Sequence, residues 1–192
     1  IQDGVERLVF AAGSSAVNSI QEIEAKVLKV AELLEVQTDK VEKTLERIVS
    51  EWKELRRNKE HLAETLAKYM AEKYLLTAEQ VSGLKLVSKI VDAKDVDVDL
   101  LIKVSDELVK HDPKVVVVFI RVNKDARLIA MVGREAREKG VDAQEIAREA
   151  AAELGGGGSG RPEFAQGGGT RVEGASKALE RAKMVIRMKG EG

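Results

Sequence analysis

A glycine-rich run between residues 155 and 169 is the part of this sequence best suited to chemistry. It reads Gly-Gly-Gly-Gly-Ser-Gly-Arg-Pro-Glu-Phe-Ala-Gln-Gly-Gly-Gly. Because glycine has no side chain, its backbone N–H groups can turn outward, and a phosphate or a sugar can approach the main chain closely. A flexible linker seldom places Arg-Pro-Glu-Phe-Ala-Gln between two glycine clusters. We therefore predict an ordered loop that contacts an anion or a nucleic acid.

The run differs from two common nucleotide-binding motifs. It is not followed by Gly-Lys-Ser or Gly-Lys-Thr, as a P-loop requires. A dinucleotide fingerprint places its glycines between a strand and a helix, whereas this run lies between two segments of helical spacing. The glycines therefore predict neither kind of nucleotide site.

Basic residues become frequent after the glycines. Seven basic and four acidic residues lie between 161 and 191, a local net charge of +3 in a chain of net charge −1. A basic face beside a glycine-rich loop suits an RNA backbone, and a solvated helix face has the same composition. Phe164 is expected to anchor the loop to the core. The predicted RNA-binding residues are Gly156, Gly157, Gly158, Arg161, Gln166, Gly167, Gly168, Arg171, Lys177 and Arg181.

The sequence offers few residues for metal binding or acid–base catalysis. It has no cysteine, which excludes disulfides and thiolate ligands. Its two histidines, His61 and His111, lie far apart, and a zinc site or a Ser-His-Asp triad needs more partners. We predict no catalytic residue, no metal site and no cofactor in this chain.

Composition indicates helices with solvated faces and a modest core. Charged residues make up 34% of the 192 residues and aromatic residues only 3%. No apolar run reaches membrane-spanning length, and the first residues do not resemble a secretion signal. We therefore expect a cytoplasmic protein of one or two small domains.

The elements that position the glycine-rich run begin with a short strand. Residues 5–10 alternate between two faces and are bounded by glycines, as in a β-strand. A strand without a partner is not stable in water. Residues 1–13 are therefore predicted to be the last strand of a domain that has been removed.

Two helices with apolar stripes are predicted in residues 14–76. Residues 14–36 repeat apolar side chains at steps of three and four, and residues 38–74 carry a heptad seam. We predict an antiparallel, coiled-coil-like hairpin whose shorter helix leaves part of the seam uncovered. That part is predicted to join a homodimer, and contact with the removed domain is the alternative. The predicted interface residues are Trp52, Leu55, Leu62, Leu66 and Tyr69.

Residues 77–192 are predicted to form a small α+β or α/β domain that contains the glycine-rich loop. The assignments rest on β-branched runs, on alternation and on helical spacing. The expected strands are 83–91, 115–120 and 126–132, and the expected helices are 98–110, 142–154 and 173–189. Asp142 and Glu145 stand where a capping box requires them.

Two motifs of this sequence resemble the C-terminal region of archaeal-type alanyl-tRNA synthetases. Arg161-Pro162-Glu163-Phe164-Ala165-Gln166-Gly167-Gly168-Gly169 resembles the signature of their DHH-associated domain. Gln2 to Phe10 resembles the last strand of their editing domain. The resemblance covers the whole chain.

The resemblance implies a helical part that supports dimerisation and a globular part that binds the outer corner of tRNA-Ala, in support of aminoacylation and editing. The parent enzyme would use ATP, Mg²⁺ and an editing-site Zn²⁺, none of them held by this chain. Two alternatives are the substrate-binding domain of a DHH-type phosphoesterase or nuclease, and a purely structural oligomerisation domain. Phosphoesterases usually place a histidine after the glycines, where this chain has Arg161, which favours the synthetase.

Overall fold

The computed structural model describes residue 10 and residues 12–190 of the chain. The strand predicted within residues 1–13 lies outside the described residues, apart from 10, 12 and 13. The chain divides into two units, residues 1–59 and residues 60–192, and each is described by itself. Among the described helices, none is long and apolar enough to cross a membrane.

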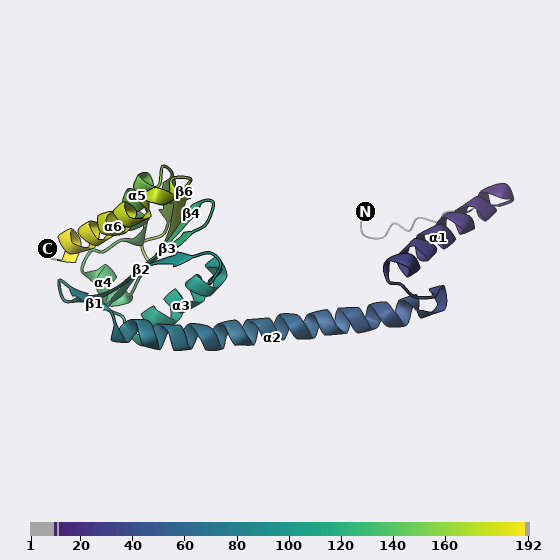
Figure 1. Cartoon of the computed structure of the whole chain (residues 1–192), viewed down its shortest axis with the longest axis horizontal. Coiled ribbons are helices and arrows are strands. Elements are labelled where there is room, and N and C mark those ends of the chain that lie inside the picture. The colour runs from purple at the N-terminus through teal and green to yellow at the C-terminus, as the bar shows by residue number, and fades with distance from the viewer. Residues whose placement is uncertain (1–9, 11, 191–192) are drawn as a thin grey trace. The chain divides into compact units, whose positions relative to one another are not determined.

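The first unit contains two helices joined by a 3₁₀ turn, which are α1 (Ser14–Leu33), η1 (Thr38–Lys40) and the first part of α2 (Val41–Leu76) (Figure 1). Helix α1 ends because Glu35 adopts a left-handed conformation, with φ at 54°. The N–H of Val36 then donates a 3.0 Å hydrogen bond to the carbonyl of Ala31. This Schellman arrangement buries Ala31 at the turn.

Both predicted helices are present, but within the first unit α1 does not bury its apolar stripe on α2. Ile20, Ile23 and Val27 of α1 are 64%, 61% and 40% exposed. Near the turn, Ala31 is buried and Leu34 half-buried. The predicted antiparallel hairpin is therefore not seen in the described part of this unit, because the turn packs only the adjoining helix ends.

A six-stranded mixed sheet lies at the centre of the second unit. Its strands are β1 (Glu79–Val81), β2 (Leu84–Asp92), β3 (Val115–Val122), β4 (Ala126–Val132), β5 (Gly157–Gly160) and β6 (Phe164–Gly169). Their order is β1-β2-β3-β4-β6-β5; β2 and β3 are parallel, and the other described neighbours are antiparallel. The three predicted strands are confirmed as β2, β3 and β4.

Helices connect the strands and begin at aspartate caps in two cases. They are α3 (Val98–His111), α4 (Arg134–Glu138), α5 (Ala143–Glu153) and α6 (Ala175–Gly190), the last preceded by the 3₁₀ turn η2 (Val172–Gly174). The Asp97 carboxylate accepts a 2.7 Å hydrogen bond from the N–H of Leu100 and starts α3. Asp142 accepts a 2.7 Å bond from the N–H of Gln144, which confirms the predicted cap of α5.

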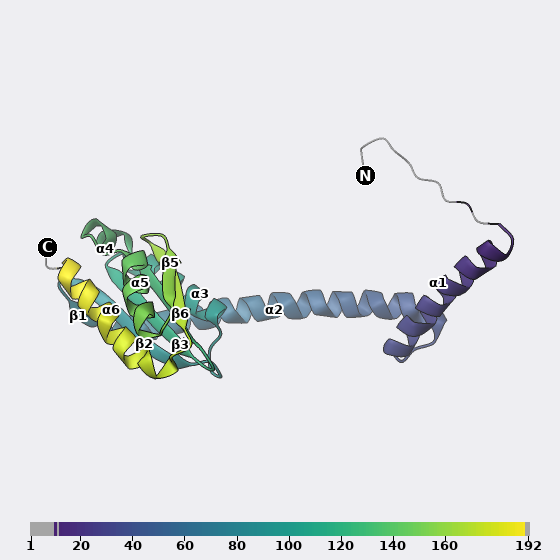
Figure 2. The ribbon, with the colours of Figure 1, turned by 90° about the horizontal axis from the view of Figure 1, so that it is seen from above.

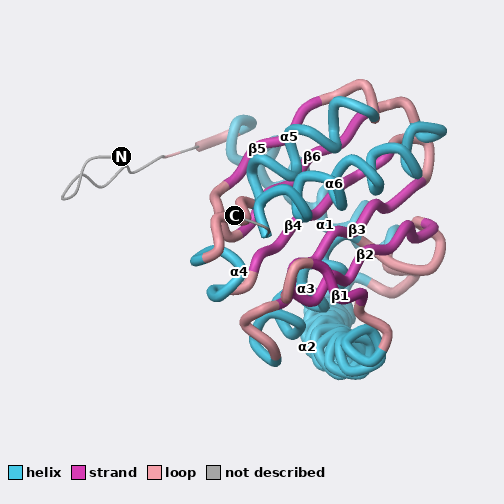
Figure 3. Tube along the Cα trace, turned by 90° about the vertical axis from the view of Figure 1, so that its left-hand side faces the viewer, coloured by secondary structure: helices cyan, strands magenta, loops and turns pink. Residues whose placement is uncertain are grey.

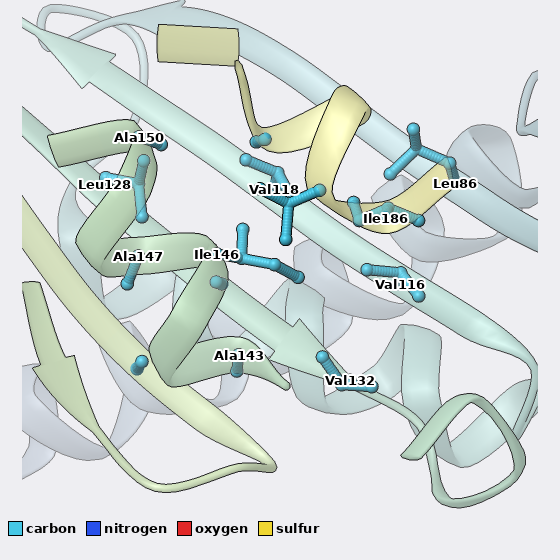
Figure 4. Packing of buried hydrophobic residues seen from close by; sticks show 14 of the residues in the cluster. Leu86, Val116, Val118, Leu128, Val132, Ala143, Ile146, Ala147, Ala150 and Ile186 are labelled. Carbon is cyan, nitrogen blue, oxygen red and sulfur yellow. The ribbon is translucent and has the colours of Figure 1, made fainter. Parts of the chain in front are cut away.

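Helices lie on both faces of the sheet (Figure 3). The sheet therefore separates two apolar cores. Helices α4, α5 and α6 cover one core, and α5 lies beside α6 (Figure 2). The side chains of this core include Leu86, Val118, Leu128, Ile146 and Ile186 (Figure 4). Helix α3 and the last turns of α2 cover the other core, where Ala67, Ala71 and Phe119 are fully buried. Of the predicted fold class, the long helix and the small α/β domain that follows it are confirmed.

The glycine-rich segment forms a β-hairpin and not the loop that we predicted. Strand β5 pairs with β6, and β6 pairs with β4, so the glycines extend the sheet. A Cβ on Gly158 would lie 2.4 Å from the backbone of Ala147 in α5. Glycine has a low strand propensity, but here the close approach of α5 outweighs it.

Candidate nucleic-acid interface

An open groove of about 720 Å³ lies where the glycine strands extend the sheet beyond β4. Its walls come from the start of α3, from the β3–β4 hairpin and from both glycine strands. They include Val98, Arg121, Arg127, Ile129, Gly157 and Gln166. The groove therefore collects residues that are far apart in the sequence.

Strand register places these side chains on one face of the sheet. Directly opposite residues in antiparallel strands point to the same side. Arg121 lies opposite Arg127, and Ile129 lies opposite Gln166. This is the face covered by α3 at β3 and β4, since Ile129 belongs to the core beneath α3.

The glycines give the groove a floor without side chains. A Cβ on Gly157 would meet no atom within 4 Å, so its backbone faces open space. Gly168 lies at the opposite register position in β6 and also lines the groove. The open backbone at Gly157 lets a sugar–phosphate chain lie close to the main chain.

The two arginines of the groove are held differently. Arg121 Nε donates a 2.8 Å hydrogen bond to the carbonyl of Val96, and its Nη2 donates a 3.3 Å bond to that of Ala93. Arg127 Nε donates a 3.0 Å bond to the carboxylate of Asp125, and 62% of the Arg127 side chain is exposed. An exposed ion pair is weak, so Arg127 can exchange this partner for a phosphate.

The groove is suited to binding a polyanion. Guanidinium groups form bidentate hydrogen bonds with phosphate, and the Gln166 amide can both donate and accept. The described residues contain no group of three or more His, Cys, Asp or Glu that could hold a metal ion.

Four of the predicted RNA-binding residues line the groove, namely Gly157, Gln166, Gly167 and Gly168. Gly156 and Gly158 lie outside its lining and are packing positions. A Cβ on Gly156 would lie 1.9 Å from the carbonyl oxygen of Gly168, and Gly158 faces α5.

Arg161 lies in the turn at the other end of the glycine hairpin. Its N–H and its carbonyl both bond to Phe164, at 2.8 and 3.1 Å. Strand β6 runs from there to Gly169, a length of roughly 17 Å at 3.4 Å per residue. The structure therefore does not bring Arg161 into the groove. Phe164 packs against the core, as predicted.

The predicted residues on α6 lie at a separate hollow, whose lining mixes basic and acidic side chains. Lys177 and Arg181 line a hollow of about 350 Å³. Arg181 donates a 2.7 Å bond to Glu149, which lowers the pKa of the Glu149 carboxyl. Arg171 directly follows Thr170, a residue of the groove lining, in the sequence.

Our sequence analysis missed Arg121 and Arg127. The signal lies between the predicted strands 115–120 and 126–132, because a hairpin closed there places these arginines opposite each other. Like charges directly opposite each other destabilise a sheet, so such a pair indicates a role other than stability.

The five predicted interface residues of α2 are all exposed, by between 44% and 67%. Trp52 and Leu55 belong to the first unit, and Leu62, Leu66 and Tyr69 to the second. The described residues of each unit leave them without cover.

Comparison with known protein families establishes the relationship of the chain. The sequence pattern of the DHHA1 domain matches residues 83–188, more than half of the chain. The chain belongs to the DHHA1 domain family. The matched part of this DHHA1 domain runs from β2 into α6 and includes both glycine strands.

Similar proteins include alanine–tRNA ligases. The DHHA1 chain is 36% identical to that of Methanococcoides burtonii and 35% identical to that of Thermococcus kodakarensis, over 97% and 99% of its length. These matches cover 20% and 19% of the ligases, so the chain spans about a fifth of their length. The C-Ala domain of Aquifex aeolicus alanyl-tRNA synthetase matches with 28% identity and a TM-score of 0.52, covering 57% of this chain and 97% of that domain. The resemblance inferred from the glycine motif is confirmed.

Proposed function

We propose that this chain is the tRNA-binding module of an alanine–tRNA ligase and that its groove holds part of the RNA backbone. The observation that carries the proposal is the open backbone of Gly157 in the same groove as the exposed Arg127. The names of the similar ligases support tRNA-Ala as the RNA. Contact at the outer corner of this tRNA is a further part of the proposal. Use of ATP, Mg²⁺ and an editing-site Zn²⁺ by the whole ligase, in the cytoplasm, belongs to the same proposal.

Electrostatic attraction supplies much of the binding free energy in this proposal. Each neutralised phosphate changes the log–log salt slope of the binding constant by roughly 0.7 to 0.9. Arg171 and Lys177 form no ion pair with other described residues, so they are available to phosphates near the groove and on α6. A purely structural oligomerisation domain would show no such salt dependence.

Titration of labelled tRNA-Ala, followed by fluorescence anisotropy at several salt concentrations, tests the groove. Arg127→Ala should weaken binding roughly tenfold and reduce the salt slope by about one phosphate. Arg134→Ala is the matched control, because Arg134 is also exposed and forms a comparable surface ion pair, with Glu138 at 3.8 Å. Equal affinities for the Arg127 variant and the unchanged protein would place the RNA elsewhere.

Arg161→Ala tests whether the RNA also reaches the turn of the glycine hairpin. We expect weaker tRNA binding with no change of oligomeric state, since Arg161 is exposed and its side chain is not part of the α2 seam. Unchanged affinity would confine the RNA to the groove end of the hairpin.

We further propose that the α2 seam joins two copies of the chain. Exposed leucine and aromatic side chains at heptad spacing favour association with another helix. A second copy presents the same seam, so a homodimer covers both at once.

A further inference from the structure

The two arginines that lie opposite each other in the groove differ in their exposure and in their bonding partners. Arg127 is exposed and ion-paired, whereas Arg121 is half-buried and bonded to backbone carbonyls. The two lie opposite each other in the sheet and carry the same charge. They differ in the segment of the chain to which each guanidinium group bonds.

Arg121 contacts the loop between β2 and α3. Its guanidinium bonds to the carbonyls of Ala93 and Val96, which lie at the two ends of a four-residue stretch. The N–H of Ala93 in turn donates a 2.9 Å bond to the carbonyl of Val122, the neighbour of Arg121 in β3. The loop is therefore held to the end of β3 both by the side chain of Arg121 and by the carbonyl of Val122.

This loop leads directly into the wall of the groove. Asp97 caps α3 through the N–H of Leu100, and Val98, the first residue of that helix, lines the groove. Movement of the loop would shift the cap and Val98 together. The width of the groove therefore depends on the bonds made by Arg121.

We infer that Arg121 is a positioning residue that holds the 93–98 wall of the groove, while Arg127 contacts the ligand. The inference rests on the proposed RNA site for its effect on binding. Arginine is required because its planar guanidinium group offers separate N–H donors to the two carbonyls. The single ammonium group of a lysine cannot bond to both carbonyls in the same geometry. The charge of Arg121 matters less than its shape.

Arg121→Lys and Arg127→Lys form a matched pair, since both keep the charge and change the shape. Hydrogen exchange is measured without RNA. The amides of Ala93 and Leu100 should exchange roughly tenfold faster in Arg121→Lys than in the unchanged protein, and the exchange rates of the β3–β4 amides should stay the same. Its tRNA affinity should fall several-fold while the salt slope stays the same. Arg127→Lys should leave the exchange of these amides unaltered and retain most of the affinity.

Three results would overturn the inference. Unchanged exchange of Ala93 and Leu100 in Arg121→Lys would show that the loop does not depend on the guanidinium. An equal loss of salt slope in Arg121→Gln and Arg127→Gln would make Arg121 a direct phosphate contact. Global unfolding of both Arg121 variants, seen by circular dichroism, would assign the residue to domain stability and also reject the inference. Failure of the unchanged protein to bind tRNA would reject the proposed function alone, because the exchange experiment needs no RNA.

Discussion

Gly157 and Gly158 are neighbours in β5, but their backbones meet different surroundings. A Cβ on Gly158 would lie 2.4 Å from the backbone of Ala147, whereas one on Gly157 would meet nothing within 4 Å. Gly158→Ala should therefore lower the free energy of unfolding by about 1–3 kcal/mol, because α5 must move away from the sheet. Urea denaturation measures the change, and Gly157→Ala, expected to stay within about 1 kcal/mol of the unchanged protein, is the control.

The same pair separates stability from binding. Gly157→Ala adds a methyl group to the floor of the groove, so it should weaken tRNA binding even though the domain stays stable. Equal urea midpoints for the two variants would show that α5 does not press on Gly158. The sequence alone does not distinguish these two glycines. Gly157 faces the groove and Gly158 faces α5 because the segment is a strand, and the sequence did not predict a strand there.

Helix α2 is the element on which the proposed association depends. Leu55→Asp combined with Leu62→Asp should convert a dimer to a monomer, because two carboxylates would be buried in the seam. Arg57→Asp is the control, since it changes the net charge by the same two units on the opposite side of the helix. Light scattering during gel filtration gives the mass of each variant. A dimer that survives the double substitution moves the interface away from the seam.

The elements that could be predicted are those whose local pattern agrees with their packing. The run from Val115 to Ile120 is uniformly β-branched or apolar and is buried on both faces, so β3 follows from its composition. Asp142 marks the start of α5 in the sequence and caps it in the structure. The glycine strands could not be predicted, because what stabilises them is the proximity of α5 and not the propensity of their residues. The groove was missed in part because it requires the register of β3, β4 and β6 together.

At the scale of the whole molecule, the long helix contributes to the core of the sheet domain. Ala67 and Ala71 are fully buried, and the ring of Tyr74 lies 5.7 Å from that of Phe119. A fragment of residues 60–192 should therefore unfold in urea with a midpoint close to that of the full chain. A fragment of residues 77–192 should lose about 3 kcal/mol or more, because one side of the core beneath α3 would face water. Equal stability of the two fragments would support the domain boundary at residue 77 that the sequence predicts.

The strand order β4-β6-β5 has a consequence for a chain that is still being synthesised. Strand β5 leaves the ribosome before β6, yet β6 is the neighbour that joins it to the rest of the sheet. The floor of the groove therefore cannot close until Gly169 has emerged, whereas the seam of α2 is complete about a hundred residues earlier. In the proposed dimer, two nascent subunits can thus meet before either of them can bind RNA in the groove.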